Sequence, residues 1–563
     1  MKKKLLLITS ASLMALTLTS CQFLSDLIDI ASGSQNTNSQ GQVVASSHQP
    51  IVDISTPPAD DIEAKKASKT YNNYIKNNVY PLSATPSTGK AKLLVIPVWF
   101  TDSNKFIKEG NKDNVREDIH DAYFGEDNEV GWKSVKTYYE TESFGALTID
   151  GTVSEWYEPN KSYTYYGTDT PNDYSSAPKT SSIVEEATEW YFTNNPSDKR
   201  SNYDCNNDGY LDGVMLIYAA PDYGTLLNDK YTNLWAFCFW VQDYSAQVPG
   251  NPGVNAFFWA SYDFMYGKEV ASSRTGNRYC AGDTSHCKLD THTFIHEMGH
   301  MFGLEDYYDY SSNSYSPAGG FSMQDYNVGG HDPLSSFALG WGKAYIPTDT
   351  VNIDLKPFAT SGEMILLSPS WNTYNSAFDE YILLEYYTDL GLNELDSTYG
   401  YMSQYGKSYP MGTKDYGIRV WHVDARLLYT ATGAFSASKI TTNPEIVSGR
   451  VLLLTSNTSD DGKDDSAAYL SPLAQDPSLP GYDKKYAEYN LLQLIRNKTT
   501  ITTKTKDSFN SASLFKKGDT FSMDKFAKQF VNSGKLNSEA DLGFSFEVNA
   551  CNNTYASITV KKL

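Results

Sequence analysis

The first half of the chain alternates apolar runs of strand length with a helical pattern. Residues 93–100 (LLVIPVWF) and 214–218 (VMLIY) are apolar throughout, which predicts two buried strands. Between them, residues 182–194 repeat apolar side chains at helical spacing along one face, and Pro196 follows two residues after the end of this segment. Strands that alternate with helices favour an α/β core for this half of the chain.

The second half has a different pattern from about Val351 onward. Short runs of aliphatic and aromatic residues are separated by polar segments rich in turn-forming residues, and this spacing favours β-strands. The runs are residues 382–387, 418–423, 451–454 and 557–560. The sequence shows no fixed-period repeat, so we expect a β-rich region and not a repeat array.

The N-terminus has the pattern of an export signal. Lys2, Lys3 and Lys4 precede a mostly apolar stretch over residues 5–18, and small residues lead to Cys21. The ending resembles the lipobox of bacterial lipoproteins, in which the cysteine is acylated after cleavage. An ordinary secretory peptide with a chance cysteine is the alternative. An acylated Cys21 would anchor the chain by burying hydrocarbon in a membrane.

A polar tether is predicted after this signal. Residues 32–47 are almost all Ser, Gln, Asn, Gly, Thr and Val, and such a composition cannot bury a core. Extended to about Lys65, the segment would have an r.m.s. span on the order of 35 Å. The folded body would then stand clear of the membrane surface.

Composition narrows the class of protein. The formal net charge is −21, with 20% charged and 40% apolar residues, which is a globular composition. So acidic a chain is a poor candidate for nucleic-acid binding, because that binding relies on Lys and Arg. No run of about 20 apolar residues follows the N-terminal segment, which excludes a multi-span membrane protein. The cysteines are too sparse for a disulfide framework. Cys280 and Cys287 are close enough in sequence to form a disulfide that closes a small loop, and two unbridged thiols are the alternative.

Residues 293–307 (TFIHEMGHMFGLEDY) contain candidate metal ligands and a candidate catalytic base. His296 and His300 are four residues apart, so on a helix their imidazoles lie on one face and can bind one Zn²⁺ at about 2.0–2.1 Å. Glu297 follows the first histidine, where it can take a proton from a zinc-bound water. The other faces of this helix carry apolar side chains that can pack into a core.

A catalytic zinc ion needs three protein ligands and one open position. Gly303 permits the left-handed turn that ends a helix, and Asp306 is then placed to supply a carboxylate oxygen. We expect Asp306 to be the third ligand. Glu305 beside it and a glutamate farther downstream are the alternatives.

A second pattern of oxygen donors occupies residues 204–212, which we call the acidic loop. It reads D-x-N-x-D-G-x-x-D, with donors at the positions that wrap a Ca²⁺ ion in an EF-hand loop, although position 12 is Met215 where that loop has glutamate. The predicted calcium ligands are Asp204, Asn206, Asp208, the carbonyl of Tyr210, and Asp212. A polar turn without metal is the alternative. The ion's role would be structural.

These residues together resemble the immune inhibitor A family of secreted bacterial metallopeptidases, which is metzincin-like. The resemblance covers about residues 90–430. Besides the zinc helix, the segments that carry it are 94–102 (LVIPVWFTD), 134–147 (SVKTYYETESFGAL), 339–341 (LGW), 380–386 (EYILLEY) and 417–424 (GIRVWHVD). The resemblance implies zinc-dependent endopeptidase activity, usually on extracellular proteins. The chain departs from the family in its lipobox-like ending and in lacking the long C-terminal region of larger members.

We also expect particular roles for three further residues. Met323 lies in a turn after the zinc helix, and by the resemblance it would be the Met-turn methionine that forms an apolar floor under the zinc site. Tyr326 is a candidate hydrogen-bond donor to the oxyanion, with an ordinary packed tyrosine as the alternative. His422 lies in an apolar strand, and we expect a core histidine bonded to a neighbour, with Asp424 as the candidate.

The expected fold is α+β: a metzincin-like catalytic domain with a twisted mixed sheet and an active-site helix, followed by a β-rich region that is β-sandwich-like. The predicted organisation is a lipoprotein signal peptide over 1–20, a lipid-anchored tether over 21–65, a zinc metallopeptidase domain over 66–345, a β-rich domain over 346–505 and a C-terminal β segment over 506–563.

The expected function is zinc-dependent hydrolysis of peptide bonds in extracellular proteins, with Glu297 assisting the attack of zinc-bound water. We expect a monomer that is lipid-anchored through Cys21 at the bacterial cell surface, with protein or peptide substrates and no nucleic-acid partner. Two alternatives remain. One is a zinc hydrolase of cell-wall peptides, and the other is a non-catalytic adhesin or glycan-binding lipoprotein.

Overall fold

The computed structural model describes residues 59–68, 85–127, 129–168, 179–241, 250–266, 289–308, 317–325, 327–398, 401–402, 408–409, 412–430, 439–443, 450–453, 485, 488–503 and 510–563. The predicted signal peptide, Cys21, most of the predicted tether, Cys280, Cys287 and Tyr326 lie outside these residues. The described chain mixes helices and strands, as expected of an α+β protein. None of the helices in the described part has both the length and the apolar character needed to cross a membrane.

The described chain forms two compact units, and the division falls after Leu304. Unit 1 contains the described residues of 81–304 and the paired strands β10 (Tyr401–Met402) and β11 (Ser408–Tyr409). Unit 2 contains the remaining described residues, namely 59–68, 305–398 and those from 412 onward. The predicted domain boundaries stay predictions, since a division into compact units does not test them.

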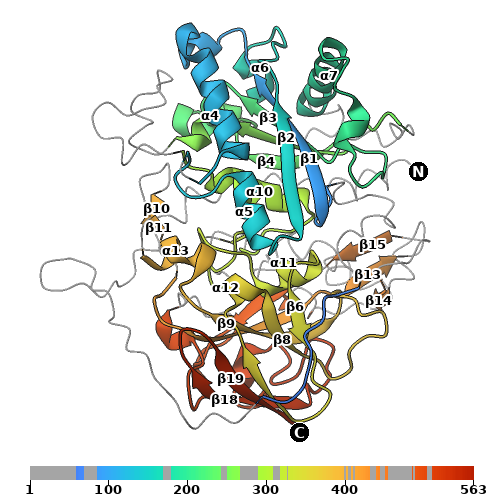
Figure 1. The fold of residues 1–563 in the computed structure, drawn as a ribbon, viewed down its shortest axis with the longest axis vertical. Helices are drawn as coiled ribbons and strands as arrows, with labels where there is room; N and C mark the ends of the chain where they lie inside the picture. The colour runs from blue at the N-terminus through green and yellow to red at the C-terminus, as the bar shows by residue number, and fades with distance from the viewer. Residues whose placement is uncertain are drawn as a thin grey trace, which may run out of the picture. The chain divides into compact units, whose positions relative to one another are not determined.

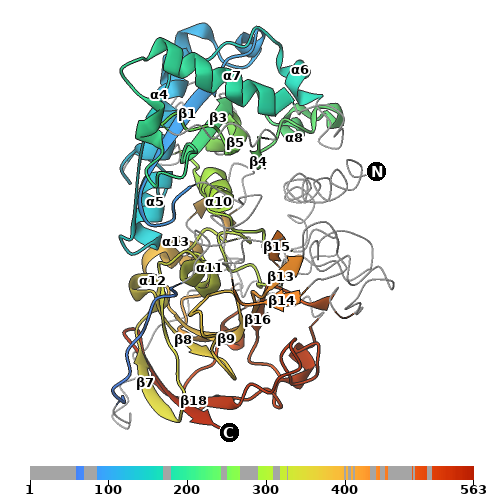
Figure 2. The same ribbon diagram turned by 90° about the vertical axis from the view of Figure 1, so that its right-hand side faces the viewer.

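Unit 1 is built on a five-stranded mixed sheet in the order β2-β1-β3-β5-β4, whose strands are labelled in Figure 1 and Figure 2. The first four strands in this order are parallel, and β4 pairs antiparallel at the edge. The strands are β1 (Gly89–Val98), β2 (Leu147–Val153), β3 (Gly213–Tyr218), β4 (Phe237–Trp240) and β5 (Ala256–Ser261). The two apolar runs that predict buried strands correspond to β1 and β3, so both predictions are confirmed.

Helices cover both faces of this sheet, which explains why β3 and β5 are buried along their whole length (Figure 2). On one face, alternate strand residues such as Phe257 and Trp259 share a core with α7 (Lys179–Asn194). On the other face, Phe258 packs against Phe294 of α10. The helices of unit 1 are α4 (Lys112–Phe124), α5 (Val135–Glu142), α6 (Tyr163–Gly167), α7, α8 (Tyr223–Leu226) and α10 (His292–Met301). The predicted helix over 182–194 is therefore confirmed, and it begins three residues earlier.

Unit 2 is β-rich, and its two larger sheets share one hydrophobic core. One sheet has the order β16-β12-β9-β8-β6, and the other has the order β17-β18-β19-β7. Apolar side chains of both sheets belong to a single buried cluster. The strands are β6 (Lys343–Tyr345), β7 (Val351–Leu355), β8 (Glu363–Leu367), β9 (Glu380–Tyr387), β12 (Gly417–Asp424), β16 (Leu492–Ile495), β17 (Thr520–Phe521), β18 (Phe544–Cys551) and β19 (Ala556–Lys562).

The described part of unit 2 also contains a smaller sheet and three short helices. A three-stranded sheet joins β13 (Leu427–Thr430), β14 (Lys439–Thr441) and β15 (Arg450–Leu453). The helices are α11 (Pro333–Ala338), α12 (Phe358–Ser361) and α13 (Glu394–Thr398). The final strand β19 pairs antiparallel with β7, about two hundred residues earlier in the chain. The C-terminal segment is thus part of the same unit, while the β-sandwich-like description stays a prediction.

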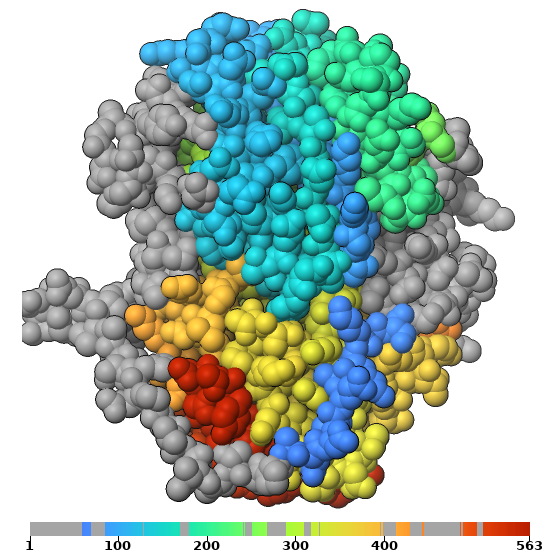
Figure 3. All heavy atoms as spheres, in the orientation of Figure 1, coloured from blue at the N-terminus to red at the C-terminus, as the bar shows by residue number. Residues whose placement is uncertain are grey.

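Residues 59–68 lie along the surface of unit 2, where Figure 3 shows them in blue over residues coloured yellow. The backbone of Asp60 bonds to Asn352, and Lys65 forms a β-bridge with Ala344. These residues include the end of the segment predicted as a tether. The chain is therefore held to unit 2 before it enters β1.

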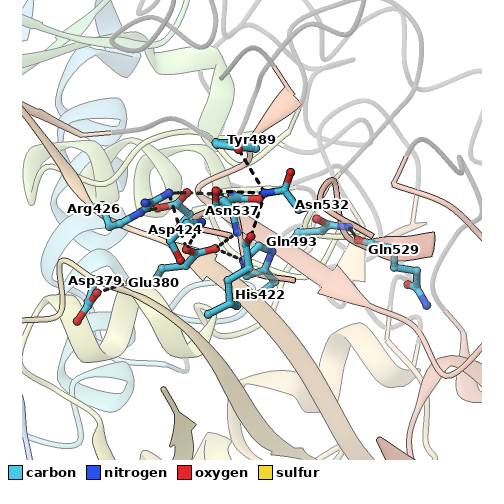
Figure 4. Close-up of polar contacts among 12 residues, drawn as sticks. Asp379, Glu380, His422, Asp424, Arg426, Tyr489, Gln493, Gln529, Asn532 and Asn537 are labelled. Carbon is cyan, nitrogen blue, oxygen red and sulfur yellow. Dashed lines mark hydrogen bonds and ion pairs between the residues drawn. The ribbon is translucent and has the colours of Figure 1, made fainter. Parts of the chain in front are cut away.

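A buried polar network ties the segment around Asn537 to the central strands of unit 2 (Figure 4). Glu380, the first residue of β9, accepts a hydrogen bond from His422 Nε2 at 2.8 Å and another from the backbone N–H of Ser538 at 2.8 Å. Asn537 donates its side-chain amide to Asp424 at 2.9 Å. His422 is a hydrogen-bonded core histidine, as expected, but its partner is Glu380 and not Asp424. The pairing of β9 with β12 sets Glu380 opposite Asp424, two residues from His422, and so within reach of the His422 ring.

Candidate metal site

The helix α10 begins at His292 and carries His296, Glu297 and His300. Its apolar face is buried: Phe294 stacks on Tyr123 of α4 with ring centroids 5.4 Å apart. The predicted helix is thus present, and its apolar residues pack into the core of unit 1. This packing leaves the two histidines, one helical turn apart, on a shared face with ring centroids 5.0 Å apart.

The end of α10 is shaped by a glycine. Gly303 has φ +90°, a backbone conformation that residues with a Cβ rarely adopt. Its N–H donates to the carbonyl of His300 at 2.9 Å, and the N–H of Leu304 donates to the carbonyl of Gly299 at 3.2 Å. These two bonds close the helix as in a Schellman motif, so the chain turns back within three residues. The predicted left-handed turn at Gly303 is confirmed.

This turn brings three side chains together. The nearest ligand atoms of His296, His300 and Asp306 all lie within 4.8 Å of one another. His296 is 7% exposed and Asp306 only 1% exposed, while His300 is half-buried. The group contains Asp306 and not its neighbour Glu305, so among the three candidates for the third position the structure assembles the expected one.

The orientation of His300 is fixed by its other ring nitrogen. Nδ1 lies 2.8 Å from the carbonyl oxygen of Leu304, and a carbonyl can only accept. Nδ1 therefore carries a proton, and Nε2 is the ring nitrogen that can donate a lone pair to a metal. Two imidazoles and one buried carboxylate are a donor set that zinc binds in catalytic sites, so the residues present fit the predicted ion.

Of the other predicted residues of this site, two are buried and one lies outside the described residues. Glu297 lies beside His296 and is buried, with 2% of its surface exposed. Met323 is fully buried in a turn, and its role as an apolar floor stays a prediction. Tyr326 lies outside the described residues, so its predicted role as an oxyanion donor is likewise untested.

The acidic loop 204–212 folds through its own hydrogen bonds. The carboxylate of Asp204 accepts from the backbone N–H groups of Asp208 and Gly209, at 2.9 and 3.1 Å. Asp208 accepts in turn from the N–H of Tyr210 at 3.0 Å, and Asn206 accepts from Asp208 at 3.1 Å. These bonds form successive Asx turns that define the backbone of the loop. Calcium binding here stays a prediction.

The last carboxylate of the loop joins it to the central sheet. Asp212 accepts from the backbone N–H of Cys205 at 3.0 Å and from that of Lys92 in β1 at 2.7 Å. Burial raises the pKa of Asp212 to about 7, although these hydrogen bonds oppose the rise. The side chain therefore anchors the loop at the entry to β3.

The cysteines in the described part of the chain are not paired with one another. Cys205 is exposed, while Cys238 and Cys551 are buried, and all three are free thiols. The possible bridge between Cys280 and Cys287 lies outside the described residues.

Three contributors to the site were not predicted from the sequence. Leu304 acts through its carbonyl oxygen, which has no side-chain signature. Tyr139 of α5 donates its hydroxyl to the carbonyl of Ile295 at 2.7 Å, and Cys238 of β4 donates its thiol to the carbonyl of Glu297 at 3.0 Å. Tyr139 lies in the segment 134–147 that supports the family resemblance, whereas a single cysteine in a strand carries no signal of its own.

Two histidines one turn apart on a helix, an adjacent glutamate and an aspartate that converges on the histidines have the arrangement of a metallopeptidase site. Residues 84–225 match the family model described as immune inhibitor A peptidase M6, catalytic domain, so this part of the chain is similar to that family of peptidases. The match supports a hydrolase of peptide bonds and confirms the resemblance seen in the sequence. It spans β1, β2 and β3 and ends before α10, so the histidine motif lies outside the matched residues. No curated protein matches the chain.

Proposed function

We propose that the chain is a zinc-dependent endopeptidase that hydrolyses peptide bonds of extracellular proteins. The observation that carries this proposal is that the ligand atoms of His296 and His300 on α10 and of Asp306 after its end lie within 4.8 Å of one another. The buried Glu297 directly follows His296 on the same helix. The family match of residues 84–225 supports the same class of reaction.

The chain's own residues would divide the work as follows. His296, His300 and Asp306 hold the ion and leave one position open for water or substrate. Bound zinc supplies a Lewis acid and a water molecule of lowered pKa. Glu297 accepts the proton of the attacking water and returns it to the leaving amine. His300 keeps its orientation through the hydrogen bond to Leu304.

The test compares digestion of an unfolded protein by wild type and by Glu297→Gln, with the zinc content of both. We expect the variant to keep its zinc and to lose at least about 10²-fold in kcat/KM, because a general base contributes about 10²–10⁴-fold. Glu363→Gln, which changes a buried carboxylate of β8 in unit 2, is the matched control and should retain activity. Equal digestion by wild type and Glu297→Gln would rule out Glu297 as the base.

The same assay separates the proposal from the two alternatives. Release of products from peptidoglycan fragments without digestion of proteins would replace it with a hydrolase of cell-wall peptides. Full-length protein that binds no zinc and hydrolyses neither substrate would favour a binding lipoprotein.

We also propose that the chain is exported and anchored by a lipid on Cys21, which rests on the N-terminal pattern alone. Mass spectrometry of the mature N-terminus should find an acylated cysteine as the first residue. Cys21→Ala should move the protein from the membrane fraction to the soluble one. A mature N-terminus at any other position would refute the anchor and leave the peptidase proposal intact.

We further propose a structural Ca²⁺ ion in the acidic loop, because its oxygen donors have EF-hand spacing and stand at the entry to β3. Calcium should then raise the thermal midpoint of the wild type but not that of Asp208→Asn. Equal midpoints with and without calcium in the wild type would show that the loop is an unmetallated turn.

A further inference from the structure

The backbone of α10 receives two side-chain hydrogen bonds from neighbouring elements. Tyr139 of α5 donates its hydroxyl to the carbonyl of Ile295 at 2.7 Å. Cys238 of β4 donates its thiol to the carbonyl of Glu297 at 3.0 Å. The two accepting residues stand immediately before and after His296 in the chain. Both contacts therefore hold the turn of helix that carries a metal-ligand candidate and the candidate base.

These bonds are made in a dry environment. Tyr139 has no exposed surface, and Cys238 is 6% exposed. A hydrogen bond is stronger in such a low-dielectric surrounding than in water, and its loss leaves a buried polar atom with fewer partners. Burial also holds the pKa of Tyr139 well above its ordinary value, so the hydroxyl keeps its proton and remains a donor.

The geometry restricts more than one motion of the helix. One donor comes from a helix and the other from the edge strand of the sheet, and α10 packs against both elements. The ring of Tyr139 also packs edge-to-face on Phe302, with centroids 5.0 Å apart, at the end of the same helix. Two bonds from different neighbours, to the carbonyls of Ile295 and Glu297, oppose both sliding along the helix axis and rotation about it. Apolar packing alone resists these motions less, because it has no fixed direction.

Such a restriction matters at a metal site. The imidazole of His296 must stay within a few tenths of an ångström of its position for the metal-ligand distance to hold. Groups that orient ligands without touching the metal typically change metal affinity or activity by about 10–100-fold when removed.

We propose that Tyr139 and Cys238 are positioning residues of the metal site, which act through the backbone of α10 to place His296 and Glu297. The inference rests on the proposed function only in taking zinc as the ion. Neither residue contacts the ion or a substrate; each fixes the helix that does.

The experiment measures zinc affinity by competition with a chelator for full-length wild type, Tyr139→Phe, Cys238→Ala and Cys238→Ser. We expect Tyr139→Phe and Cys238→Ala to bind zinc about tenfold more weakly. Cys238→Ser keeps a donor at the same position and should recover most of that loss. Peptidase kcat should fall with affinity in the two deficient variants while KM stays nearly unchanged.

The matched control is Tyr218→Phe. Tyr218 of β3 is also fully buried and donates its hydroxyl to a backbone carbonyl, that of Trp235 at 3.2 Å, but this bond does not involve α10. The control should lower the thermal midpoint about as much as Tyr139→Phe does and leave zinc affinity unchanged. This comparison separates positioning of the site from general stability.

The outcomes distinguish this inference from the proposed function. Wild-type zinc affinity in both Tyr139→Phe and Cys238→Ala, with midpoints lowered as in Tyr218→Phe, would overturn the positioning role. A wild type that binds zinc but digests no peptide would overturn only the proposed function, since the affinities still decide the inference. Failure of Cys238→Ser to recover affinity would remove Cys238 from the proposal.

Discussion

In the segment 292–306, the ligand atoms of two histidines and one aspartate converge within 4.8 Å, whereas the carboxylates of the acidic loop 204–212 accept hydrogen bonds from nearby backbone N–H groups. Both segments carry metal-ligand residues at regular spacing in the sequence. The difference arises from local structure. An α-helix satisfies its own backbone and leaves its side chains available, while a loop recruits its Asp and Asn side chains to satisfy its backbone.

This comparison shows that donor spacing alone does not tell how a segment uses its donors. In the helix, a histidine can take a second partner, as His300 does with Leu304, and still offer a nitrogen to a metal. In the loop, each carboxylate accepts hydrogen bonds from the backbone, and an ion would share these carboxylates with the backbone. We therefore expect the helix site to be essential for activity and the loop to affect stability.

The largest effect should come from His300→Ala compared with Asp208→Asn. His300→Ala should lose stoichiometric zinc and at least about 10³-fold in kcat/KM, since Lewis-acid stabilisation of a transition state is worth several kcal/mol. Asp208→Asn should keep both the zinc and the activity. Elemental analysis and kinetics of the two variants provide the measurement, and the opposite pattern would reverse the roles of the two segments.

A sharper test concerns the third ligand. Asp306→Asn replaces a charged ligand oxygen by a neutral amide oxygen, so zinc affinity should fall by on the order of 10²-fold or more. Glu305→Gln, one residue earlier, is the matched control and should bind zinc as the wild type does. Chelator competition measures both. A loss confined to Glu305→Gln would contradict the assigned geometry of the turn after Gly303.

The pH dependence of stability should reveal the buried carboxylate of the acidic loop in calcium-free solution. The pKa of Asp212 is about 7 in the folded protein because of burial, and near 4 in the unfolded chain. The folded state then holds this proton more tightly, so the free energy of unfolding should fall as pH rises from about 4 to 7, by on the order of 4 kcal/mol. Denaturant titrations at several pH values should show this slope in the wild type, and a much smaller one in Asp212→Asn.

A buried carboxylate of unit 2 should show the opposite sign. Burial by itself would raise the pKa of Glu380, but the hydrogen bond and charge of His422, together with Arg426, lower it to about 2. Its stabilising contribution is present above about pH 4.5 and is lost as pH falls toward 2, on the order of 3 kcal/mol in all. Acid unfolding followed by a probe in unit 2 should be less steep in Glu380→Gln. An unchanged acid transition would mean that this network does not control acid stability.

The smallest effect is expected from Tyr123→Phe, which completes the comparison with Tyr139→Phe. Both tyrosine rings pack on α10, but the hydroxyl of Tyr123 has no hydrogen-bond partner in the described part of the chain. Removing an unpaired buried hydroxyl should leave stability unchanged or raise it by about 1 kcal/mol. Thermal unfolding measures this, and a clear loss of stability would show that the hydroxyl does have a partner.

Much of the fold follows from local patterns. The runs that become β1 and β3 are apolar enough to be recognised as buried strands, because two covered faces require apolar residues at every position. The helix over 179–194 is recognisable from its single apolar face. The pairing of β19 with β7, however, joins residues 556–560 to 351–355, and no local pattern specifies such a distant partner.

In the candidate site, too, some features follow from the local sequence and others depend on tertiary contacts. The sequence by itself determined the two histidines, the adjacent glutamate and the turn at Gly303, because helical spacing and glycine's conformational freedom are local properties. Only the tertiary structure decided that Tyr139 and Cys238 contact the backbone of α10, and that Glu380, not Asp424, is the partner of His422. These contacts depend on how separate elements pack against one another, and the sequence spacing of residues carries no information about directions in space between elements.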